Sequence, residues 1–350
     1  MSPDFAQRIS RRHALAEAGR ISLAATSVSG LLAACGAVAR QAAPPAAPTR
    51  GTAVPSATAE PTATPDTRPV TVAITGDIML GRSVASQMLA TNDRFPFNGT
   101  ADYLKGFDIT VGNLECVVST LGTAVPNKTY HFRADPRGFG RLRDAGFQLV
   151  SLANNHTGDF GAAAFADMLA QLPDQGIAAV GGGLNRAAAH TPAIRTVRTT
   201  TIGFLAYCEV DPFSFAATAS SPGHAWLDPA LVTADITAVR PHVDFLVVFA
   251  HWGIEYQAAQ SADQRAMARV AIDAGADVVV GAHPHVIQPY ETYNGKLIVY
   301  SLGNFVFDEM TSDNVRRGDV LTLTVGGTQL VDWKLRQSYI TGDFGQPQWV

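Results

Sequence analysis

Short apolar runs recur along the chain from residue 70, and a stretch of helical periodicity follows most of them. Six runs rich in Val, Ile and Leu are predicted as strands, at residues 70–75, 107–111, 147–153, 243–250, 276–280 and 296–302. Strands that alternate with helices indicate an α/β domain in which crossover helices join parallel strands. Near the end of the chain, "DVLTLTVGGTQLVDWKLRQ" predicts a β-hairpin around Gly326 and Gly327.

The apolar pattern starts only at about residue 69. Residues 36–68 consist largely of Pro, Ala and Thr and contain almost nothing that could form a core. This composition favours an extended, solvated linker. We therefore expect a single domain at residues 69–350, preceded by a disordered linker at residues 36–68.

Residues 1–35 have the pattern of an export signal. Arginines flank the apolar stretch 21–34, which is too short to span a bilayer as a helix. Leu-Ala-Ala-Cys at residues 32–35 resembles the lipobox of bacterial lipoproteins, in which the cysteine, here Cys35, is lipidated. "SRRHAL" also resembles a twin-arginine signal, so general (Sec) secretion and twin-arginine export both stay open. We expect an extracytoplasmic lipoprotein held at the membrane, with an ordinary cleaved signal or an uncleaved anchor as the alternatives.

Composition narrows the choice of partner. The formal net charge is −4, and a mildly acidic protein is a poor partner for nucleic acid. After Cys35, the remaining thiols belong to Cys116 and Cys208. We expect these two to be buried small apolar residues rather than a disulfide.

Polar side chains that can bind metal stand where five of the predicted strands end. Such positions matter because ligand sites of open α/β sheets gather beyond the carboxyl ends of the strands. The candidate ligands are Asp77, Glu115, Asn155, His251, His283 and His285. Together they offer carboxylate, amide and imidazole ligands, which suit Mn, Zn or Fe better than Ca or Mg. Six ligands exceed the four of a structural zinc site. Two ions about 3.5–4 Å apart would use them all, with one histidine of the His-x-His pair for each.

Several segments together resemble one family. "GDIMLGR", "GNLE", "LANNH", "HWGIEY", "GAHPHV" and "YSLGNFVFD" are similar to the CapA proteins of poly-γ-glutamate capsule synthesis and export, a branch of the calcineurin-like metallophosphoesterase superfamily. The resemblance covers nearly all of residues 70–310 in the same order. It implies a four-layer α-β-β-α sandwich in which two sheets pack between helix layers.

The resemblance also implies roles for individual residues. Asp77 and His285 would hold a first ion, and a second would lie among Asn155, His251 and His283. His156 falls where the superfamily keeps a histidine that protonates the leaving group.

Two positions depart from the superfamily pattern. Met79 replaces a ligand histidine, and Asn113 replaces the bridging aspartate. A thioether is a poor ligand for these ions, and Glu115 is the nearest carboxylate that could bridge instead. One ion or two ions therefore both remain open.

Other polar residues near the strand ends are candidates for substrate binding. Arg82 and Arg133 could each clamp an anionic group, because a guanidinium pairs with carboxylate or phosphate. Asn304 could bind substrate or a ligand histidine, and Asn113 is a further candidate for the substrate.

Three functions fit these features. The first is a CapA-like protein that hydrolyses poly-γ-glutamate or another anionic surface polymer with metal-activated water, beside a membrane-embedded synthase or export partner. The second is a metal-dependent phosphoesterase for small extracytoplasmic substrates. The third is a polymer-binding or export module without catalysis.

Overall fold

The computed structural model describes residues 66–91, 93–210 and 213–350. The expected signal at residues 1–35, including Cys35, lies outside this range, as does nearly all of the expected linker. Among the residues described, no helix is both long enough and apolar enough to cross a bilayer. Cys116 and Cys208 are buried and free, as expected.

The first sheet contains the strands that open and close the described chain. Its order is β18-β17-β16-β1-β2-β5-β6, and β15 pairs with the end of β1. β1, β2, β5 and β6 are parallel, whereas β16, β17 and β18 form an antiparallel edge. The bounds are β1 Val70–Ile78, β2 Ile109–Leu114, β5 Leu149–Ser151, β6 Ala178–Val180, β15 Asn304–Val306, β16 Arg317–Gly326, β17 Gln329–Thr341 and β18 Gln346–Trp349. The hairpin predicted around Gly326 and Gly327 is confirmed, since Gly326 pairs with Gln329.

The second sheet has the order β13-β14-β12-β11-β9-β8. Its four central strands are parallel, and β8 and β13 pair with them in the antiparallel sense at the two edges. The bounds are β8 Ala193–Val197, β9 Thr200–Cys208, β11 Phe245–His251, β12 Val278–Ala282, β13 Ile287–Tyr293 and β14 Lys296–Leu302. The predicted strand at residues 296–302 agrees with β14 at both ends.

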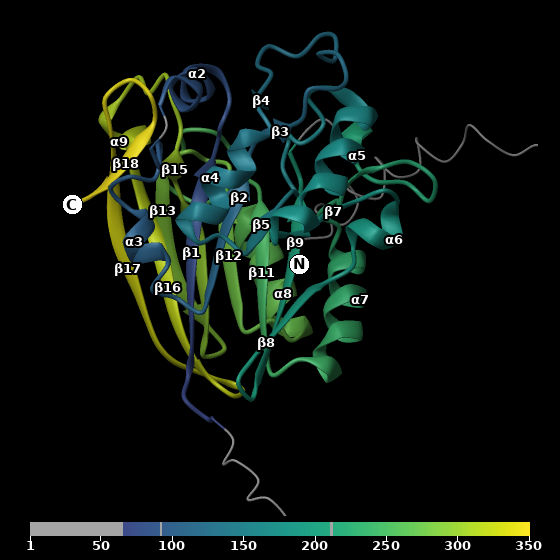
Figure 1. Ribbon diagram of the computed structural model, residues 1–350. Helices are drawn as coiled ribbons and strands as arrows, with labels where there is room; N and C mark the ends of the chain where they lie inside the picture. Colours follow the sequence, from purple (N-terminus) through teal and green to yellow (C-terminus); the bar gives the residue numbers. More distant parts are fainter. Residues whose placement is uncertain (1–65, 92, 211–212) are drawn as a thin grey trace, which may run out of the picture. The chain divides into compact units, whose positions relative to one another are not determined.

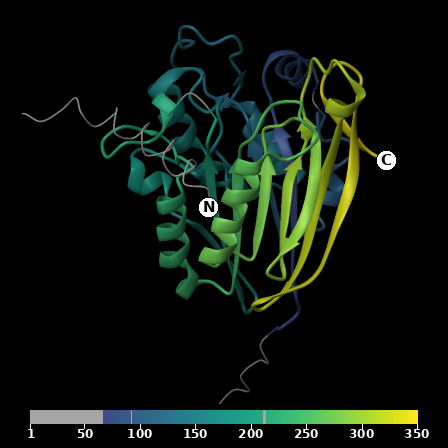
Figure 2. The same cartoon turned by 180° about the vertical axis from the view of Figure 1, so that it is seen from behind.

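Helices cover the outer faces of the two sheets (Figures 1 and 2). Apolar side chains of the first sheet, such as Ile74 and Val111, pack between the sheets against Phe204, Val247 and Val280 of the second. The other face of the first sheet packs on α2 Arg82–Ala90, α3 Ala101–Leu104, α4 Arg137–Ala145 and α5 Gly161–Gln171. On the second sheet, α8 Ala262–Ala274 packs on β12 and β14, and α7 Pro229–Val239 packs beside α8. The expected four-layer α-β-β-α sandwich is confirmed.

Shorter elements complete the described chain. Two small ladders join β3 with β4 and β7 with β10. Their bounds, and those of the short helices, are β3 Val117–Val118, β4 Arg133–Ala134, β7 Gly182–Gly183, β10 Gly223–His224, α6 Arg186–Ala189, α9 Asp313–Arg316, η1 Pro173–Gln175, η2 Phe213–Phe215 and η3 Arg240–His242.

β1 continues past the predicted strand at residues 70–75 because β15 joins it. Gly76 makes this possible, since a Cβ at that position would lie 1.9 Å from the carbonyl oxygen of Gly303. The backbone N–H of Asp77 donates to the same oxygen at 3.1 Å. Asp77 is therefore fixed inside a strand rather than in the loop that follows it. β1 rises in Figure 1 toward α2, and the candidate ligands lie at this end.

Candidate metal centre and substrate pocket

Asp77 lies at the end of β1 and is completely buried. Its Oδ1 accepts a hydrogen bond of 2.8 Å from Nδ2 of Asn113. Its Oδ2 accepts one of 3.3 Å from the backbone N–H of His283 and lies 3.3 Å from Nδ1 of His285. The first sheet thus meets the loop after β12 of the second sheet at this carboxylate.

Glu115 directly follows β2, and none of its surface is exposed. Within the described part of the chain, neither carboxylate oxygen has a hydrogen-bond partner. Oε1 lies 3.8 Å from Nε2 of His251 and 3.8 Å from Nε2 of His285. Burial, with the nearby charge of Asp77, raises the pKa of Glu115 well above its usual range. A buried carboxylate without partners is costly, and a metal ion is one of the few groups that satisfy it.

His251 ends β11 and contacts Asn155, which lies in the loop after β5. Its Nε2 lies 2.9 Å from Oδ1 of Asn155, and its Nδ1 lies 3.2 Å from Nδ2 of Asn113. Burial holds the pKa of His251 well below its usual value. The imidazole is therefore neutral, which is the form that binds a metal.

His283 and His285 lie beyond the end of β12, with φ angles of 94° and 58°. Because both are in the left-handed region, the alternation of a strand does not describe where their side chains point. His283 packs with its ring centroid 4.8 Å from that of His251. Its Nδ1 is buried and, among the residues described, has no hydrogen-bond partner.

The His285 ring contacts three polar residues of the centre. Its Nδ1 lies 2.9 Å from Oδ1 of Asn304. Burial opposes a charge on this ring, but the Glu115 carboxylate, with Asp77 and Asn304, outweighs burial and raises the pKa of His285 to about 10. In the absence of a cation, His285 and Glu115 therefore retain a proton between them.

Two overlapping groups of ligand atoms emerge from this geometry. Asp77, Glu115 and His251 form one, and Glu115, His283 and His285 form the other, with all atoms of a group within 4.8 Å of one another. Glu115 belongs to both, and Asn155 joins through its contact with His251. All six residues that the sequence suggested as ligands thus converge. The orphaned oxygens of Glu115 and the orphaned Nδ1 of His283 fit a divalent cation.

His156 stands beside this centre on the loop after β5. Its Nδ1 lies 2.7 Å from Oδ2 of Asp159, and its ring stacks on Phe132 with centroids 3.9 Å apart. The Nζ of Lys128 donates to the other Asp159 oxygen, and to the carbonyl oxygen of Asn155 at 2.5 Å. Burial lowers the pKa of His156 to about 4, even though Asp159 raises it. The ring is neutral near pH 7.

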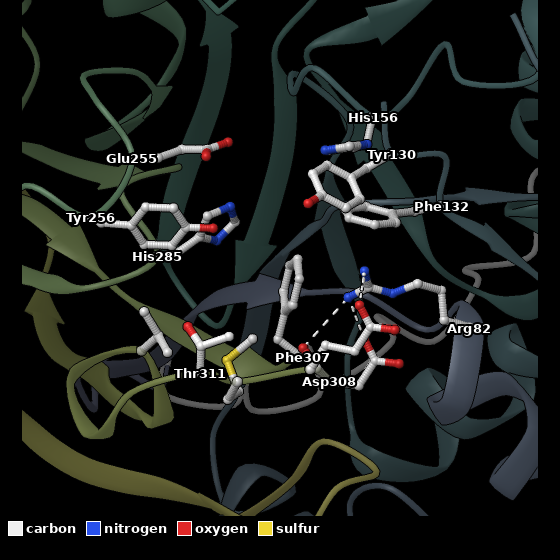
Figure 3. Close-up of a pocket in the computed structure, with 13 residues that line it drawn as sticks. Arg82, Tyr130, Phe132, His156, Glu255, Tyr256, His285, Phe307, Asp308 and Thr311 are labelled. Atoms are coloured by element: carbon white, nitrogen blue, oxygen red, sulfur yellow. Dashed lines mark hydrogen bonds and ion pairs between the residues drawn. The ribbon is translucent and has the colours of Figure 1, made fainter. Parts of the chain in front are cut away.

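A pocket of about 220 Å³ opens over His156 and His285, which lie on opposite sides of it in Figure 3. Aromatic rings and charged side chains share its wall. The lining residues are Arg82, Tyr130, Phe132, His156, Glu255, Tyr256, His285, Phe307, Asp308, Glu309, Met310, Thr311 and Val315. A substrate in this pocket would contact both the candidate metal centre and His156.

The four candidates for substrate binding take different places. Arg82 lines the pocket, where it pairs with Asp308 (Figure 3). Asn304 is fully buried and bonds His285 rather than lining the pocket. Asn113 bonds Asp77 and is also buried. Arg133 lies outside the pocket lining. It donates to two loop carbonyl oxygens, at 2.8 and 3.0 Å, and its guanidinium stacks on Phe160, 3.6 Å from the ring centroid.

Sequence reasoning missed three polar residues that organise the site. Asp159 was detectable, because it follows His156 by three residues within one loop. Asn154, whose Nδ2 donates to Oδ1 of Asn113 at 3.2 Å, precedes the candidate ligand Asn155 directly. Lys128 had no such signal, since it lies in a loop distant in sequence from both partners.

The four-layer α/β fold brings candidate oxygen and imidazole ligands together at its strand ends. The chain is therefore an α/β protein with a candidate metal centre. A model of the family described as "Bacterial capsule synthesis protein PGA_cap" matches residues 71–309. The chain belongs to this family.

Two relatives are CapA proteins. The "PGA biosynthesis protein CapA" of Bacillus subtilis (strain 168) is 34% identical over 242 residues, 69% of this chain and 64% of the relative. The "Capsule biosynthesis protein CapA" of Bacillus anthracis is 32% identical over 251 residues, 70% and 61% of the two chains. The chain thus matches less than two thirds of the length of either relative.

Among solved structures, the calcineurin-like phosphoesterase YfkN from Bacillus subtilis superposes with a TM-score of 0.45 and 14% identity. The match covers 79% of this chain and 93% of that one.

Proposed function

We propose that this member of the capsule synthesis family is a metal-dependent hydrolase that acts on an anionic envelope polymer of the poly-γ-glutamate type. One observation supports the hydrolytic site above all others. The buried Glu115 carboxylate has two orphaned oxygens, and the imidazoles of His251 and His285 face it at 3.8 Å. A divalent cation would satisfy oxygens and nitrogens arranged in this way.

The residues divide around Glu115. The family resemblance assigns Asp77 and His285 to one ion and Asn155, His251 and His283 to a second. The spatial groups instead place Asp77 with His251 and His283 with His285, and Glu115 is available to both ions in either division. Mn, Zn and Fe suit this mixture of ligands. When bound, such a cation lowers the pKa of a coordinated water and stabilises negative charge on the group under attack.

His156 supplies the proton chemistry in this proposal. Its Nδ1 is engaged by Asp159, so Nε2 is the nitrogen left to exchange a proton with substrate. Because the pKa of His156 is about 4, the ring must first take up a proton before it can donate one to a leaving group. The Asp159 carboxylate favours that uptake. Stacking on Phe132 fixes the ring plane.

The cellular setting is part of the same proposal. The lipobox-like sequence before Cys35 supports a lipid anchor on the outer side of the cytoplasmic membrane. There the pocket would meet a growing or exported polymer, beside a membrane-embedded synthase or export protein.

Metal content and hydrolysis test the proposal. Full-length protein loaded with Mn²⁺ or Zn²⁺ should retain at least one ion per chain, measured by plasma mass spectrometry. It should shorten poly-γ-glutamate, and His156→Ala should abolish that activity. His190→Ala is the matched control, because His190 also bonds an aspartate, Asp235, at 2.7 Å, but lies outside the pocket.

Two results would discriminate between the functions, and a third tests the role of His156. Retention of much less than one ion would favour a polymer-binding or export module. Cleavage of bis-p-nitrophenyl phosphate without any change in poly-γ-glutamate would favour a phosphoesterase. Full activity of the His156→Ala variant would remove His156 from the mechanism.

A further inference from the structure

Two carboxylates, one buried and one exposed, bind the guanidinium of Arg82. Nη2 donates to the carboxylate of Asp308, whose side chain is fully buried, and Nη1 donates to Oε2 of Glu309 at 2.9 Å. The Glu309 side chain is 65% exposed. Oδ2 of Asp308 is fixed in turn by the backbone N–H of Ser83 at 2.9 Å and its hydroxyl at 2.6 Å. Asp308 is therefore a buried and fixed partner of Arg82, whereas Glu309 is an exposed partner.

Aromatic rings fix the guanidinium in the pocket wall. Its Cζ lies 4.7 Å from the ring centroid of Phe132 and 5.7 Å from that of Phe307. Phe132 is the ring on which His156 stacks. Arg82 and His156 therefore line the same pocket, as Figure 3 shows.

Nη1 is the guanidinium nitrogen whose partner is exposed. In the described chain, Nε of Arg82 is buried and has no hydrogen-bond partner, so a ligand in the pocket does not reach it. Among the residues described, Nη1 donates only to the exposed Glu309 carboxylate. Ion pairs with an exposed partner contribute little to stability, so another carboxylate can replace Glu309 at small cost. Replacement of Asp308 would instead leave a buried charge unpaired.

Charge balance points the same way. Asp308 alone neutralises Arg82, so Glu309 adds a negative charge beyond what the guanidinium requires. While Glu309 is bound to Nη1, its extra negative charge repels any other anion at the mouth of the pocket.

We infer that Glu309 occupies the place of a substrate carboxylate, so that Nη1 of Arg82 is a carboxylate subsite and Glu309 is a built-in competitor for it. This inference rests on the proposed function, in which the pocket receives an anionic polymer. A chain that carries a carboxylate on every unit presents the same chemical group that Glu309 presents now. Binding then exchanges one carboxylate for another on a guanidinium that Asp308 keeps in position.

Calorimetric titration of the full-length protein with a γ-linked glutamate pentamer tests the exchange. Glu309→Gln should lower the Kd about fivefold, because the competitor is lost while Asp308 still orients Arg82. Asp343→Asn is the matched control. It removes one negative charge from an exposed residue whose backbone oxygen contacts Ser83, outside the pocket lining, and should change the Kd less than about twofold.

Double substitution separates the ion pair from general charge. Arg82→Gln should weaken binding, and Arg82→Gln combined with Glu309→Gln should bind no tighter than Arg82→Gln alone. Equal gains from Glu309→Gln and Asp343→Asn would overturn the inference, as would weaker binding by Glu309→Gln. Absence of pentamer binding by every variant would also overturn it.

Two further arms fix the chemical class and isolate the inference from the proposed function. A pentamer with its carboxylates converted to amides should gain nothing from Glu309→Gln, and an equal gain for inorganic phosphate would refute the carboxylate assignment. The titrations are repeated after treatment with a chelator. If the Glu309 effect persists after chelation, the subsite does not depend on the metal. It then stands even where the metal-loaded protein fails to shorten poly-γ-glutamate, which refutes hydrolysis alone.

Discussion

Asn113 donates a hydrogen bond of 2.8 Å to Oδ1 of Asp77, where the ends of β2 and β1 lie side by side. The same Nδ2 lies 3.2 Å from Nδ1 of His251, and Oδ1 of Asn113 accepts from Asn154. An amide can serve as donor and acceptor at once, whereas an ionised carboxylate only accepts. Asn113 therefore ties two candidate ligands together by hydrogen bonds, and Glu115 is left as the second carboxylate of the centre.

Asn113→Asp tests this arrangement. The new carboxylate would face Oδ1 of Asp77 without the hydrogen that now joins them, so the metal-free protein should lose about 2–3 kcal/mol of unfolding free energy. Mn²⁺ should recover most of the loss, because a carboxylate adds a ligand. Urea unfolding with and without metal measures both effects. Asn98→Asp is the control, since Asn98 bonds Asp93 at 2.7 Å on the surface, and it should cost less than about 0.5 kcal/mol.

Glu115→Gln should separate metal binding from folding. Burial, with the nearby charge of Asp77, raises the pKa of Glu115 well above its usual range and so disfavours the ionised carboxylate in the metal-free protein. A neutral amide should therefore leave the Tm within about 2 °C. Saturating metal, at about a hundred times the Kd, should raise the Tm of the unaltered protein by about 5 °C, and this gain should largely vanish in the variant. Differential scanning calorimetry measures both.

Glu209→Gln is the control for that experiment. Burial also raises the pKa of Glu209, but its Oε1 accepts a backbone hydrogen bond of 3.0 Å from Gly253, and it stands outside the two ligand groups. Its metal-induced gain in Tm should persist. An undiminished gain in Glu115→Gln would remove Glu115 from the metal centre.

Much of the architecture could be read from periodicity. The apolar runs marked the central strands, and the polar residues after them marked the end at which Asp77 and His283 meet. Strand ends were less accurate. The pattern ended the first strand at residue 75, whereas the close approach of Gly303 to Gly76 extends β1 to Ile78. A partner strand more than two hundred residues away decides that boundary, and local sequence does not contain it.

Hydrogen-bond partners at the centre were harder to predict than the ligands. Residue type identified His285 as a ligand candidate, but its bond to Asn304 depends on how β15 approaches the loop after β12. Residue type likewise does not predict the left-handed backbone at His283 and His285. In the same way, Lys128 reaches Asp159 only because two loops fold over each other.

Lys128→Met should destabilise the protein through Asp159. The Asp159 side chain is fully buried, and loss of Lys128 leaves that carboxylate with the His156 ring and a backbone N–H of Phe132 as its partners. Removal of one partner of a buried pair costs about 3–5 kcal/mol, and we expect about 2–4 because the lysine is partly solvated. Lys334→Met removes an exposed lysine with a surface partner and should cost about 0.5 kcal/mol or less. Urea denaturation of both variants gives the comparison. Similar losses of unfolding free energy in the two variants would contradict a stabilising role for the pair of Lys128 and Asp159.

Asp319 on β16 makes the stability depend on pH. Burial raises its pKa from 3.8 to about 6, so the folded protein binds this proton more tightly than the unfolded chain does. The stability gained from the protonated group is complete below about pH 4 and is lost as the pH rises through 6. Asp319→Asn removes the titration. The variant should match the unaltered protein at pH 4 and be more stable at pH 8, by about 1–2 kcal/mol after allowance for partial solvation.

Guanidinium denaturation at both pH values measures the difference. Asp332→Asn, at an exposed position on β17, should show no such difference, and an equal gain for Asp319→Asn at pH 4 and pH 8 would rule out burial of the charge as the cause.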